Sequence, residues 1–524
     1  MFEKSISLNK SMAIAAVLPA VLMSSALCGQ AWAQATPNDK WVTVVVSTEP
    51  TDLDGCQSRR DFQGRVVKQN IVETLVQTDP KNNYALMPRL ATSWERSDDT
   101  TWRFKLRPNV KFHDGAAFDA KAVQNSIKRT TSQPYCSDKA LLQGFTMEST
   151  VIDDHTIEFK TSRPEPMLPL RFSGVSIVSP NTTFDKISLA PVGTGPFVFD
   201  KWTAGQQITL KRNDAYWGKK PTTEGARYLW RAESAVRASM VRIGEADIAV
   251  EVNQQDSIER ETDPARIKSK SYTTVNGTFF LRLDSSQAPL NDRRVRLAMN
   301  HAIDGTSFIG TVLPKEAKPA TQIVVPDIPG HNFEIDKRRY AYDPAKARQL
   351  LAQAKADGVP IDKEIMLFSY PAVMASATEL MEAYHAQFKA VGLNMKLQAL
   401  EAGEYAKYNT RPFPDPRPVH VLQTLHDNIT GDPLLSLTTR YTCKGNNSVF
   451  CDDDIEKRVQ KAASLEGPPR VKEVEEIFRI LHEDIVADVV LYHMVAFTMV
   501  NNRVKFVPDL TVSAEVRLEE ILFQ

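Results

Sequence analysis

Residues 376–399 read SATELMEAYHAQFKAVGLNMKLQA and contain two patterns in succession. From Ser376 to Val391 the apolar side chains recur at the spacing of a helix, and Gly392 follows as a residue that commonly ends one. Residues 395–399 then alternate between apolar and polar side chains, which is the two-residue period of a strand. A helix that leads directly into a strand predicts an α/β domain with a mostly parallel sheet.

Two further stretches agree with this class of fold. Val42 to Val46 is a run of β-branched residues, and it predicts a buried strand that leads into the loop beginning at Ser47. Asp343 and Pro344 combine an N-cap residue with a first-turn proline, and they predict a helix over residues 347–354.

Between these stretches the pattern changes along the chain. Apolar residues recur at helical spacing over residues 66–75, which predicts a helix that ends before Asp79. Residues 102–106 alternate between apolar and basic side chains after the turn at Ser97–Asp99, which predicts a hairpin with one face toward water. Asp119 is predicted to cap the next helix.

The first residues have the composition of an export signal. Two lysines within the first ten residues precede an apolar run from Met12 to Leu27, and small residues at Ala33 and Ala35 suit cleavage. We expect residues 1–35 to be a signal peptide, cleaved near Ala33 or Ala35, and the mature protein to be periplasmic. A lipid anchor at Cys28 is the competing interpretation, but Leu27 stands where bacterial lipoproteins carry a small residue.

Length and charge limit the classes of protein that fit. A mature chain of about 490 residues exceeds what one hydrophobic core usually serves, so two or more domains are expected. The chain has 64 basic and 64 acidic residues, and loss of the signal would leave 62 and 63. This balance argues against binding to nucleic acid and against a polybasic membrane surface.

Four cysteines follow the predicted cleavage site: Cys56, Cys136, Cys443 and Cys451. An even number in an oxidising compartment indicates disulfides. Cys443 and Cys451 stand eight residues apart across a turn-rich loop, which makes them the local pair and leaves Cys56 with Cys136. No Cys-x-x-Cys occurs and no histidine flanks these cysteines at ligand spacing, so neither a metal site nor a cofactor is expected.

A series of ordered blocks runs along nearly the whole mature chain. These blocks are LMPRLATSWE at 86–95, WRFKLR at 102–107, VKFHDG at 110–115, PVGTGPF at 191–197, NDAYW at 213–217, GEADI at 244–248 and DRRVRLAMNHAID at 292–304. The series resembles the dipeptide-, oligopeptide- and nickel-binding class, family 5, of ABC importer solute-binding proteins.

The resemblance implies a bilobal α/β fold of the periplasmic-binding-protein type with a small extra subdomain. Lobe I would comprise residues 36–80, 191–280 and 496–524, the subdomain inserted in it residues 81–190, and lobe II residues 281–495. The chain would cross between the lobes around Asn276 and His493, and two crossings form a hinge on which the lobes can close around a ligand.

The function that the resemblance implies is that of a binding subunit rather than an enzyme. A monomer would capture a peptide or peptide-like solute in the periplasm and deliver it to an inner-membrane permease and its ATPase. A non-peptide solute, such as an opine, a sugar-phosphate conjugate or a metal chelate, remains open, as does a sensor or chaperone role on the same fold.

Several residues are candidates for contact with the ligand. Asp427 would pair with the ammonium group of a peptide, since a buried cation needs a charge partner, although an Asx-turn role is equally open. His426 stands where peptide-binding relatives carry a glycine after an aromatic residue, which puts an ordinary peptide in doubt. Tyr370 is expected at a strand end that meets the cleft, with core packing as the alternative.

The opening loop of lobe I, residues 52–60, supplies the remaining candidates. Asp54 lies in this loop, and Arg59 or Arg60 could hold a ligand carboxylate or phosphate, with a solvated surface position as the alternative. Asn276, in the first crossing segment, completes the predicted set.

Other polar motifs are interpreted as structural. His113–Gly115 and Gly193–Gly195 are predicted to be turns, because the first fits turn chemistry and the second lacks the third glycine of a dinucleotide loop. Arg293, Arg294 and Arg296 are predicted to form the solvated face of a helix. A secreted hydrolase is the alternative class, but the chain lacks the motifs Gly-x-Ser-x-Gly and His-Glu-x-x-His, and the mature chain lacks Ser-x-x-Lys.

Overall fold

The computed structural model describes residues 40–58, 61–82, 84–259, 261–374, 376–428, 431–508 and 515–524. The predicted signal peptide and the candidate residues Arg59 and Arg60 therefore lie outside the described residues. Within the described ranges, no helix is long and apolar enough to cross a bilayer.

A single sheet runs through both lobes. Over the described residues it has 11 strands in the order β10-β11-β12-β1-β13-β19-β14-β18-β16-β17, with β15 paired to β19. The strands are β1 (Trp41–Val46), β10 (Phe197–Thr203), β11 (Gln207–Arg212), β12 (Gly225–Trp230), β13 (Ile248–Val252), β14 (Ser269–Leu283), β15 (Lys318–Pro319), β16 (Ile365–Ser369), β17 (Met395–Ala399), β18 (His420–His426) and β19 (Asp488–Asn501). Strands with helices on both sides confirm the predicted α/β class. The prediction of a mostly parallel sheet is wrong, because four of the strand pairs in the described part of this sheet are parallel and six are antiparallel.

The predicted strand at Val42–Val46 is confirmed as β1, in the centre of the lobe I part of the sheet. It pairs in parallel with both β12 and β13. Val44 and Val46 pack into one core cluster and Val45 into another, on the opposite face. Burial on both faces explains why the run is continuously apolar rather than alternating.

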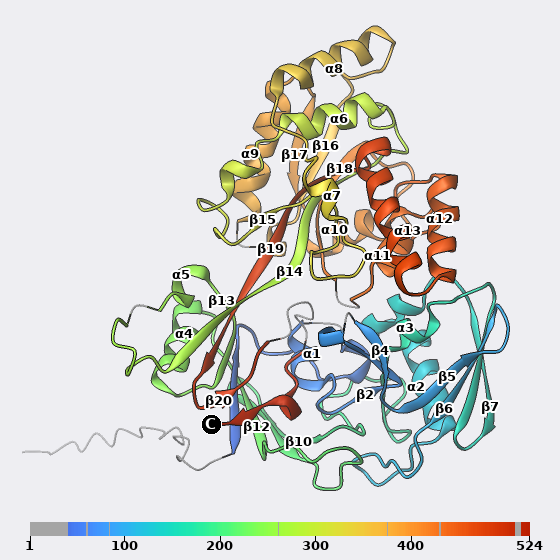
Figure 1. Ribbon diagram of the computed structural model, residues 1–524, viewed down its shortest axis with the longest axis vertical. Coiled ribbons are helices and arrows are strands. Elements are labelled where there is room, and N and C mark those ends of the chain that lie inside the picture. The colour runs from blue at the N-terminus through green and yellow to red at the C-terminus, as the bar shows by residue number, and fades with distance from the viewer. Residues whose placement is uncertain are drawn as a thin grey trace, which may run out of the picture. The chain divides into compact units, whose positions relative to one another are not determined.

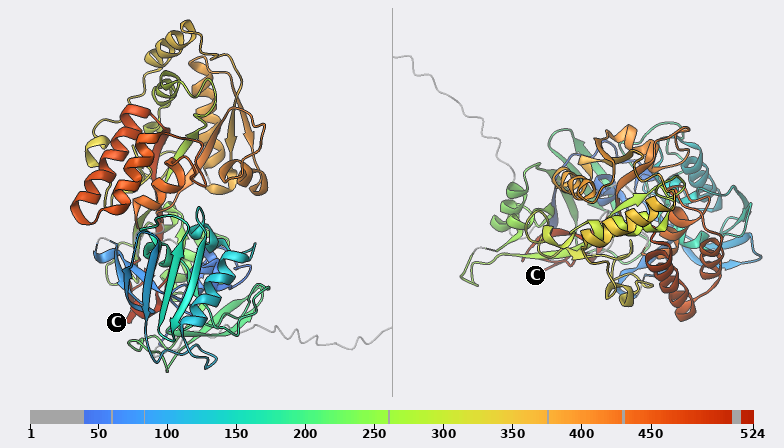
Figure 2. Two further views of the ribbon diagram at one scale, coloured as in Figure 1. Left: turned by 90° about the vertical axis from the view of Figure 1, so that its right-hand side faces the viewer. Right: turned by 90° about the horizontal axis from the view of Figure 1, so that it is seen from above.

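The helices of lobe II cover both faces of β16–β18. They are α6 (Arg293–Ala302), α7 (Phe333–Asp336), α8 (Pro344–Ala356), α9 (Ala377–Ala390), α10 (Ala402–Asn409), α11 (Pro433–Tyr441), α12 (Asp453–Ser464) and α13 (Gly467–Arg479). α6, α8 and α9 pack on one face, whereas α10 covers the other face of β16 and β18. α11, α12 and α13 pack beside α10, against Phe280 of β14 (Figure 2).

The predicted start of α8 and the predicted end of α9 are both confirmed. Asp343 caps α8 by accepting the backbone N–H of Lys346 at 2.9 Å. α9 follows Ser376, and Gly392 beyond its end has a φ of +101°, in the region that favours glycine. β17 then begins at Met395, as the alternation predicts.

The predicted solvated arginine face of α6 is wrong for one of its three residues. Arg294 forms exposed ion pairs with Asp292 and Asp357. Arg296 is instead buried, and it donates to the carbonyls of Leu290 and of Val486 at 2.8 and 2.9 Å. Its guanidinium therefore ties α6 to the segment that precedes β19.

A four-stranded antiparallel sheet lies within the predicted subdomain. Its strands are β5 (Ala91–Arg96), β6 (Thr101–Leu106), β7 (Met147–Asp153) and β8 (Thr156–Thr161), and they pack with α2 (Ala120–Ser132) and α3 (Leu168–Phe172). The hairpin of β5 and β6 confirms the predicted turn at Ser97–Asp99. Asp119 caps α2 by accepting the N–H of Ala122 at 2.8 Å, again as predicted.

The predicted helix over residues 66–75 is wrong beyond its first residues. α1 (Asp61–Val67) ends early, and the short strands β2 (Glu73–Thr74) and β3 (Val76–Asp79) follow. β2 pairs with β9 (Ser176–Ile177), and β3 pairs with β4 (Ala85–Pro88). The apolar residues of this segment divide between the cores of lobe I and the subdomain, so long-range pairing overrides the local period.

The remaining elements are short or peripheral. α4 (Ser234–Ile243) and α5 (Gln254–Ser257) flank β13, and β20 (Val504–Lys505) pairs with β21 (Leu522–Phe523) near the C-terminus.

β14 and β19 are the strands that cross between the lobes (Figure 1). They pair in antiparallel register from Ser269 opposite Asn501 to Arg282 opposite Asp488. Gly277 sits at a break in this register, and a Cβ there would lie 2.8 Å from the backbone oxygen of His426. The glycine thus permits the close approach of β14 to β18.

His493 is a buried titratable residue on the crossing strands. It lies on β19, its Nδ1 is 2.9 Å from the hydroxyl of Thr278 on β14, and burial is the main cause that lowers its pKa to about 3. His331 and Lys318 lower this pKa further, whereas Asp336 raises it. In the unfolded chain a histidine has a pKa of about 6.5. Between this pH and about pH 3, His493 is therefore protonated in the unfolded chain but not in the folded protein.

We therefore expect the contribution of His493 to stability to be complete above about pH 6.5 and to fall by ~1.4 kcal/mol per pH unit toward pH 3. His493→Asn should flatten the dependence of the unfolding free energy on pH between pH 6.5 and 4, measured by urea denaturation. The exposed His155→Asn is the control. An unchanged slope in His493→Asn would contradict this account.

Candidate ligand-binding site

The carboxyl ends of parallel strands in the two lobes point toward each other. β13 runs antiparallel to β19 and advances toward lobe II, whereas β18 runs antiparallel to β14 and advances toward lobe I. Along β19, His493 is level with the end of β18 and Phe497 with the end of β13. The two sets of ends are thus separated along the strands by ~13 Å, the rise of about four residues.

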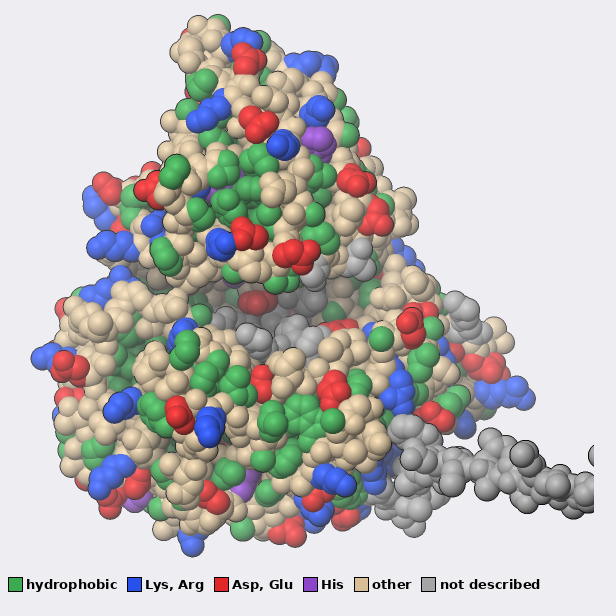
Figure 3. Space-filling model, turned by 180° about the vertical axis from the view of Figure 1, so that it is seen from behind, with side chains coloured by type: hydrophobic (Ala, Val, Ile, Leu, Met, Phe, Trp, Pro, Cys, Tyr) green, Lys and Arg blue, Asp and Glu red, His purple; other side chains and the backbone are tan. Residues whose placement is uncertain are grey.

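Figure 3 shows the surface hollowed between the two lobes. Ligands of open α/β sheets bind beyond the carboxyl ends of the strands. We therefore take the residues that follow β1, β13, β16 and β18 as the walls of the candidate site.

Asp54 does not line this space. Its side chain has no exposed surface, and its two oxygens accept from Arg129 Nη1 at 2.8 Å and Nη2 at 2.5 Å. The backbone N–H groups of Cys56 and Ser188 also donate to it. Because the protein itself occupies the carboxylate, Asp54 shapes the loop after β1 and is not kept as a proposed ligand contact.

The wall of lobe I contains an acidic residue that sequence reasoning missed. Glu251 lies near the end of β13 with a φ of +55°, an unfavourable backbone conformation for a non-glycine residue. Its carboxylate accepts from the hydroxyl of Ser47, which follows β1, and forms an ion pair with Arg65 at 2.8 Å. Burial opposes its ionisation, but Arg65 and Ser47 outweigh burial and lower its pKa.

Tyr370 stands at the end of β16 in the wall of lobe II. Its ring stacks on that of Tyr405 in α10 with centroids 4.6 Å apart, and its backbone N–H donates to Gln423 at 2.8 Å. The residue is half-buried, so one part of the ring packs and another remains accessible. This position is compatible both with contact to a ligand and with packing in the core.

Asp427 directly follows β18 and is exposed. Its carboxylate makes no hydrogen bond or ion pair with any residue that the structure describes. Gly431, a few residues on, has a φ of +65°, and a Cβ there would lie 1.9 Å from the ring of Tyr84. Gly431 therefore permits the close contact of lobe II with Tyr84 of the subdomain.

His426 is buried and serves as a support, not as part of an open wall. Its Nε2 is 2.7 Å from the hydroxyl of Ser436, and Arg440 donates from Nε to its Nδ1 at 3.1 Å. Burial and the charge of Arg440 lower the pKa of His426 well below its usual value, so the ring is neutral. Arg440, on α11, was not among the predicted site residues.

A sequence signal for Arg440 did exist. Asp432 and Pro433 are an N-cap and first-turn proline that start α11 directly after the β18 loop, and Arg440 lies in the last turn of that helix. No comparable local signal marks Glu251, since its backbone conformation and its contact with Arg65 arise only in the folded chain.

The structure thus brings Tyr370, His426 and Asp427 to one edge of lobe II, and it places Asp54 inside lobe I. Asn276 is part of β14, next to Gly277 at the crossing. Nothing is described of its side chain, nor of Arg59 and Arg60, so their roles stay predictions.

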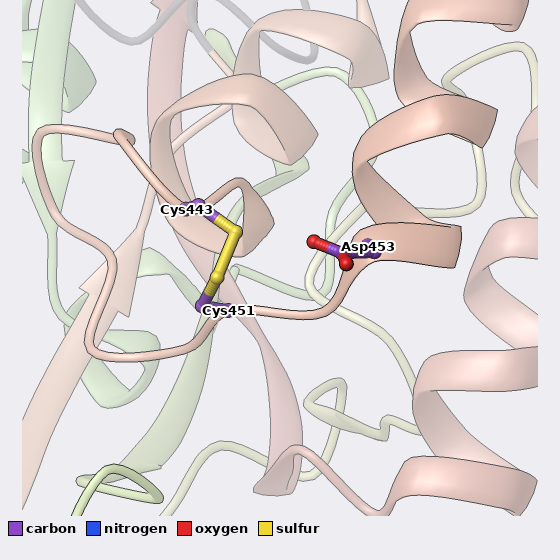
Figure 4. A group of neighbouring side chains, drawn as sticks. All are labelled: Cys443, Cys451 and Asp453. Carbon is purple, nitrogen blue, oxygen red and sulfur yellow. A yellow bond between two sulfur atoms is a disulfide. The ribbon is translucent and has the colours of Figure 1, made fainter.

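Both predicted disulfides are confirmed. Cys56 bonds to Cys136, and Cys443 bonds to Cys451. Among the described residues, one group of possible metal ligands is dense enough for an ion, namely Cys443, Cys451 and Asp453 (Figure 4). Its two sulfur atoms are joined to each other, so this group is a disulfide with a neighbouring carboxylate.

The motifs interpreted as turns are structural, as predicted. His113 Nε2 lies 2.9 Å from the carbonyl of Gly195, and Asp114 accepts from Ser179 at 2.6 Å. A Cβ on Gly193 would lie 2.0 Å from the carbonyl oxygen of Ile71. The contact of His113 joins the subdomain to lobe I, that of Asp114 lies within the subdomain and that of Gly193 within lobe I, and none of them forms a catalytic pair.

Comparison with known sequences identifies a family. The family model described as "Bacterial extracellular solute-binding proteins, family 5 Middle" matches residues 85–446. The dipeptide-binding protein of Escherichia coli (strain K12) is 27% identical over 456 residues, which are 80% of this chain and 83% of that protein. The glutathione-binding protein GsiB of Shigella flexneri is 27% identical over 377 residues, 70% of this chain and 71% of that one.

Comparison with solved structures supports the fold. The periplasmic binding protein DppA of Helicobacter pylori, associated with an ABC transporter and solved in complex with the peptide STSA, superposes with a TM-score of 0.73 at 23% identity. The match covers 92% of this chain and 98% of that one. The predicted bilobal periplasmic-binding-protein fold is confirmed.

Proposed function

The chain belongs to family 5 of the bacterial extracellular solute-binding proteins, the substrate-binding subunits of ABC importers, and from this premise we propose that its solute is a short peptide. The family consists of binding proteins and not of enzymes. The peptide would lie between the strand ends of lobes I and II, with its ammonium group on Asp427.

The exposed carboxylate of Asp427 is the observation that carries this proposal. It stands at a strand end that faces the opposite lobe and has no partner among the described residues. A ligand cation that leaves water needs an acidic partner, and an acid without an internal partner is free to supply it. The relatives include a dipeptide-binding and a glutathione-binding protein, and this supports a peptide as the solute.

The same proposal includes location and partners. The chain would be exported, cleaved near Ala33 or Ala35, and act as a periplasmic monomer. A peptide that contacts both walls would favour the closed form, because a ligand shifts an equilibrium only through its differential affinity for the two states. The permease of the inner membrane and its ATPase would then take the peptide over.

We expect Asp427→Asn to weaken peptide binding by about 10- to 100-fold, the usual cost of a charge-assisted hydrogen bond. The measurement is calorimetric titration with dialanine and trialanine, supported by thermal denaturation. A peptide at 100 times its Kd should stabilise the wild type by about 2.7 kcal/mol. N-acetylated peptides, which lack the cation, should bind the wild type and the variant equally weakly.

The control variant is Asp185→Asn, which removes one negative charge from an exposed loop of the subdomain. Equal peptide affinity in Asp427→Asn and the wild type would remove Asp427 from the site. A wild type that ignores every peptide but binds an opine or a sugar-phosphate conjugate would instead establish a non-peptide solute.

A further inference from the structure

A separate cavity opens at the end of lobe II that is remote from lobe I. It lies between the segment that follows β14, residues 411–417 and the loop before α12, and its volume is about 460 Å³. Sites for small molecules have volumes of ~300–1,000 Å³. β18 begins near this cavity at His420 and advances toward lobe I, so its length separates the cavity from the candidate solute site by ~20 Å. An occupant of the cavity would therefore not touch the solute.

The walls of this cavity contain guanidinium groups without an acidic partner. Arg296, Arg411 and Arg417 line the cavity. Arg296 is 7% exposed and is bonded to backbone carbonyls, and burial lowers its pKa. Arg411 donates to the carbonyls of Gly445 at 3.1 Å and Ser448 at 3.0 Å. Neither Arg296 nor Arg411 forms an ion pair with any residue that the structure describes. A desolvated cation without a carboxylate is unfavourable unless another anion binds it.

The acidic side chains at the cavity are already engaged. Asp452 caps α12 by accepting from two backbone N–H groups, and Asp484 forms an ion pair with Arg479 at 2.9 Å. Asp284, which is fully buried, pairs with Arg417 at 2.8 Å. Within the described part of this wall, each of these carboxylates therefore has a partner of its own, and the cavity keeps an excess of positive charge.

Two of the guanidinium groups are held in place before any ligand arrives. The Cζ atoms of Arg411 and Arg417 lie 5.2 and 5.3 Å from the centre of the Phe413 ring, which are cation–π contacts. Nη1 of each arginine makes no hydrogen bond with the described residues. The side chains of Ser285 and Asn291 also line the cavity and make none with them. The cavity thus offers charged and neutral donors that the protein itself does not use.

We propose that this cavity binds a phosphate-bearing anion. A phosphate group presents several oxygen atoms, so it can accept from more than one guanidinium and from neutral donors, whereas a carboxylate has two oxygens that match a single fork. The cavity also has room for the rest of a small phosphorylated compound. The phosphate belongs either to such a free compound or to the headgroup of an anionic lipid, and the experiment below separates these two sources.

The test is calorimetric titration of the wild type, Arg411→Gln and Asn291→Asp with inorganic phosphate and with pyrophosphate, at constant ionic strength. Asn291 is exposed, so Asn291→Asp adds a negative charge to the cavity without removing a side-chain contact to the described residues. The matched controls make the same charge changes on the exposed face of α8, namely Arg348→Gln and Gln349→Glu. Thermal melting without ligand checks that each variant folds.

We expect Arg411→Gln to weaken the binding of pyrophosphate by about 10- to 100-fold, the cost of a lost charge-assisted hydrogen bond. Asn291→Asp should weaken it by about fivefold, because a like charge faces the anion. Both control variants should bind as the wild type does, and dialanine in excess should not displace the anion. A loss in either cavity variant with unchanged controls supports the proposal.

Sedimentation with lipid vesicles identifies the source of the phosphate. If the protein sediments with phosphatidylglycerol but not with phosphatidylcholine, loses this binding in Arg411→Gln and binds neither free anion, the cavity takes a lipid headgroup. The proposal is overturned if the wild type binds none of these probes, if both cavity variants bind them as the wild type does, or if dialanine displaces the anion. None of these outcomes bears on the proposed peptide function, which Asp427→Asn tests.

Discussion

Asp54→Asn is expected to lower the free energy of unfolding by about 3–5 kcal/mol, because it breaks a buried ion pair and leaves a cation uncompensated. The side chains of Asp54 and Arg129 are 0% and 3% exposed. Burial disfavours the charge of Arg129, but Asp54 outweighs burial and raises its pKa. Urea denaturation followed by circular dichroism measures the effect.

The matched control is Asp99→Asn. Asp99 also pairs with an arginine, Arg96, but its side chain is 82% exposed. Solvent screens such a pair, so a loss of at most about 1 kcal/mol is expected. Similar losses in the two variants would show that burial of the pair with Arg129 does not determine its strength.

Removing the disulfide between Cys56 and Cys136 is the second large effect. These cysteines are 80 residues apart in sequence, so their bond restricts the unfolded chain over a long loop. The chain-entropy account predicts that the double variant Cys56→Ala, Cys136→Ala loses about 4–5 kcal/mol of unfolding free energy. Because the bond holds the loop after β1 to the subdomain, peptide affinity should be measured beside the denaturation midpoint.

The second disulfide supplies the comparison. Cys443 and Cys451 are eight residues apart, and the same account predicts a loss of about 2–3 kcal/mol in the corresponding double variant. The difference between the two double variants is the informative quantity, since it cancels the cost of changing cysteine to alanine. A larger loss of unfolding free energy on removal of the disulfide between Cys443 and Cys451 would contradict this account, in which a disulfide stabilises the protein by restricting the denatured chain.

Elements whose signals are local could be predicted from the sequence. Helix α9, with its stop at Gly392, and the caps at Asp119 and Asp343 depend on residues within one or two turns of each other. β1 was predictable because burial on both faces leaves a continuous apolar run. The structure of residues 66–75 could not be predicted in this way, because Glu73 and Thr74 pair with β9, about 100 positions later in the chain.

The site could be predicted only as a region. Asp427, His426 and Tyr370 could be proposed because they end segments with strand patterns, and the structure gathers them at one edge of lobe II. Nothing in the sequence distinguishes exposed Asp427 from buried Asp54, since both are aspartates in turn-rich loops. Asp54 meets Arg129 75 residues later, and that contact determines its burial.

The sequence by itself determined the α/β class and the family, because composition, period and ordered motifs are properties of the linear chain. It favoured one pairing of the four cysteines, and the structure decided that pairing. Tertiary structure alone decided which charges are available to a solute. Glu251 is paired with Arg65 from another element, whereas Asp427 is exposed. The reason is physical: burial and pairing depend on distances between residues far apart in the sequence, such as the 186 positions between Arg65 and Glu251, and these distances close only when the chain folds.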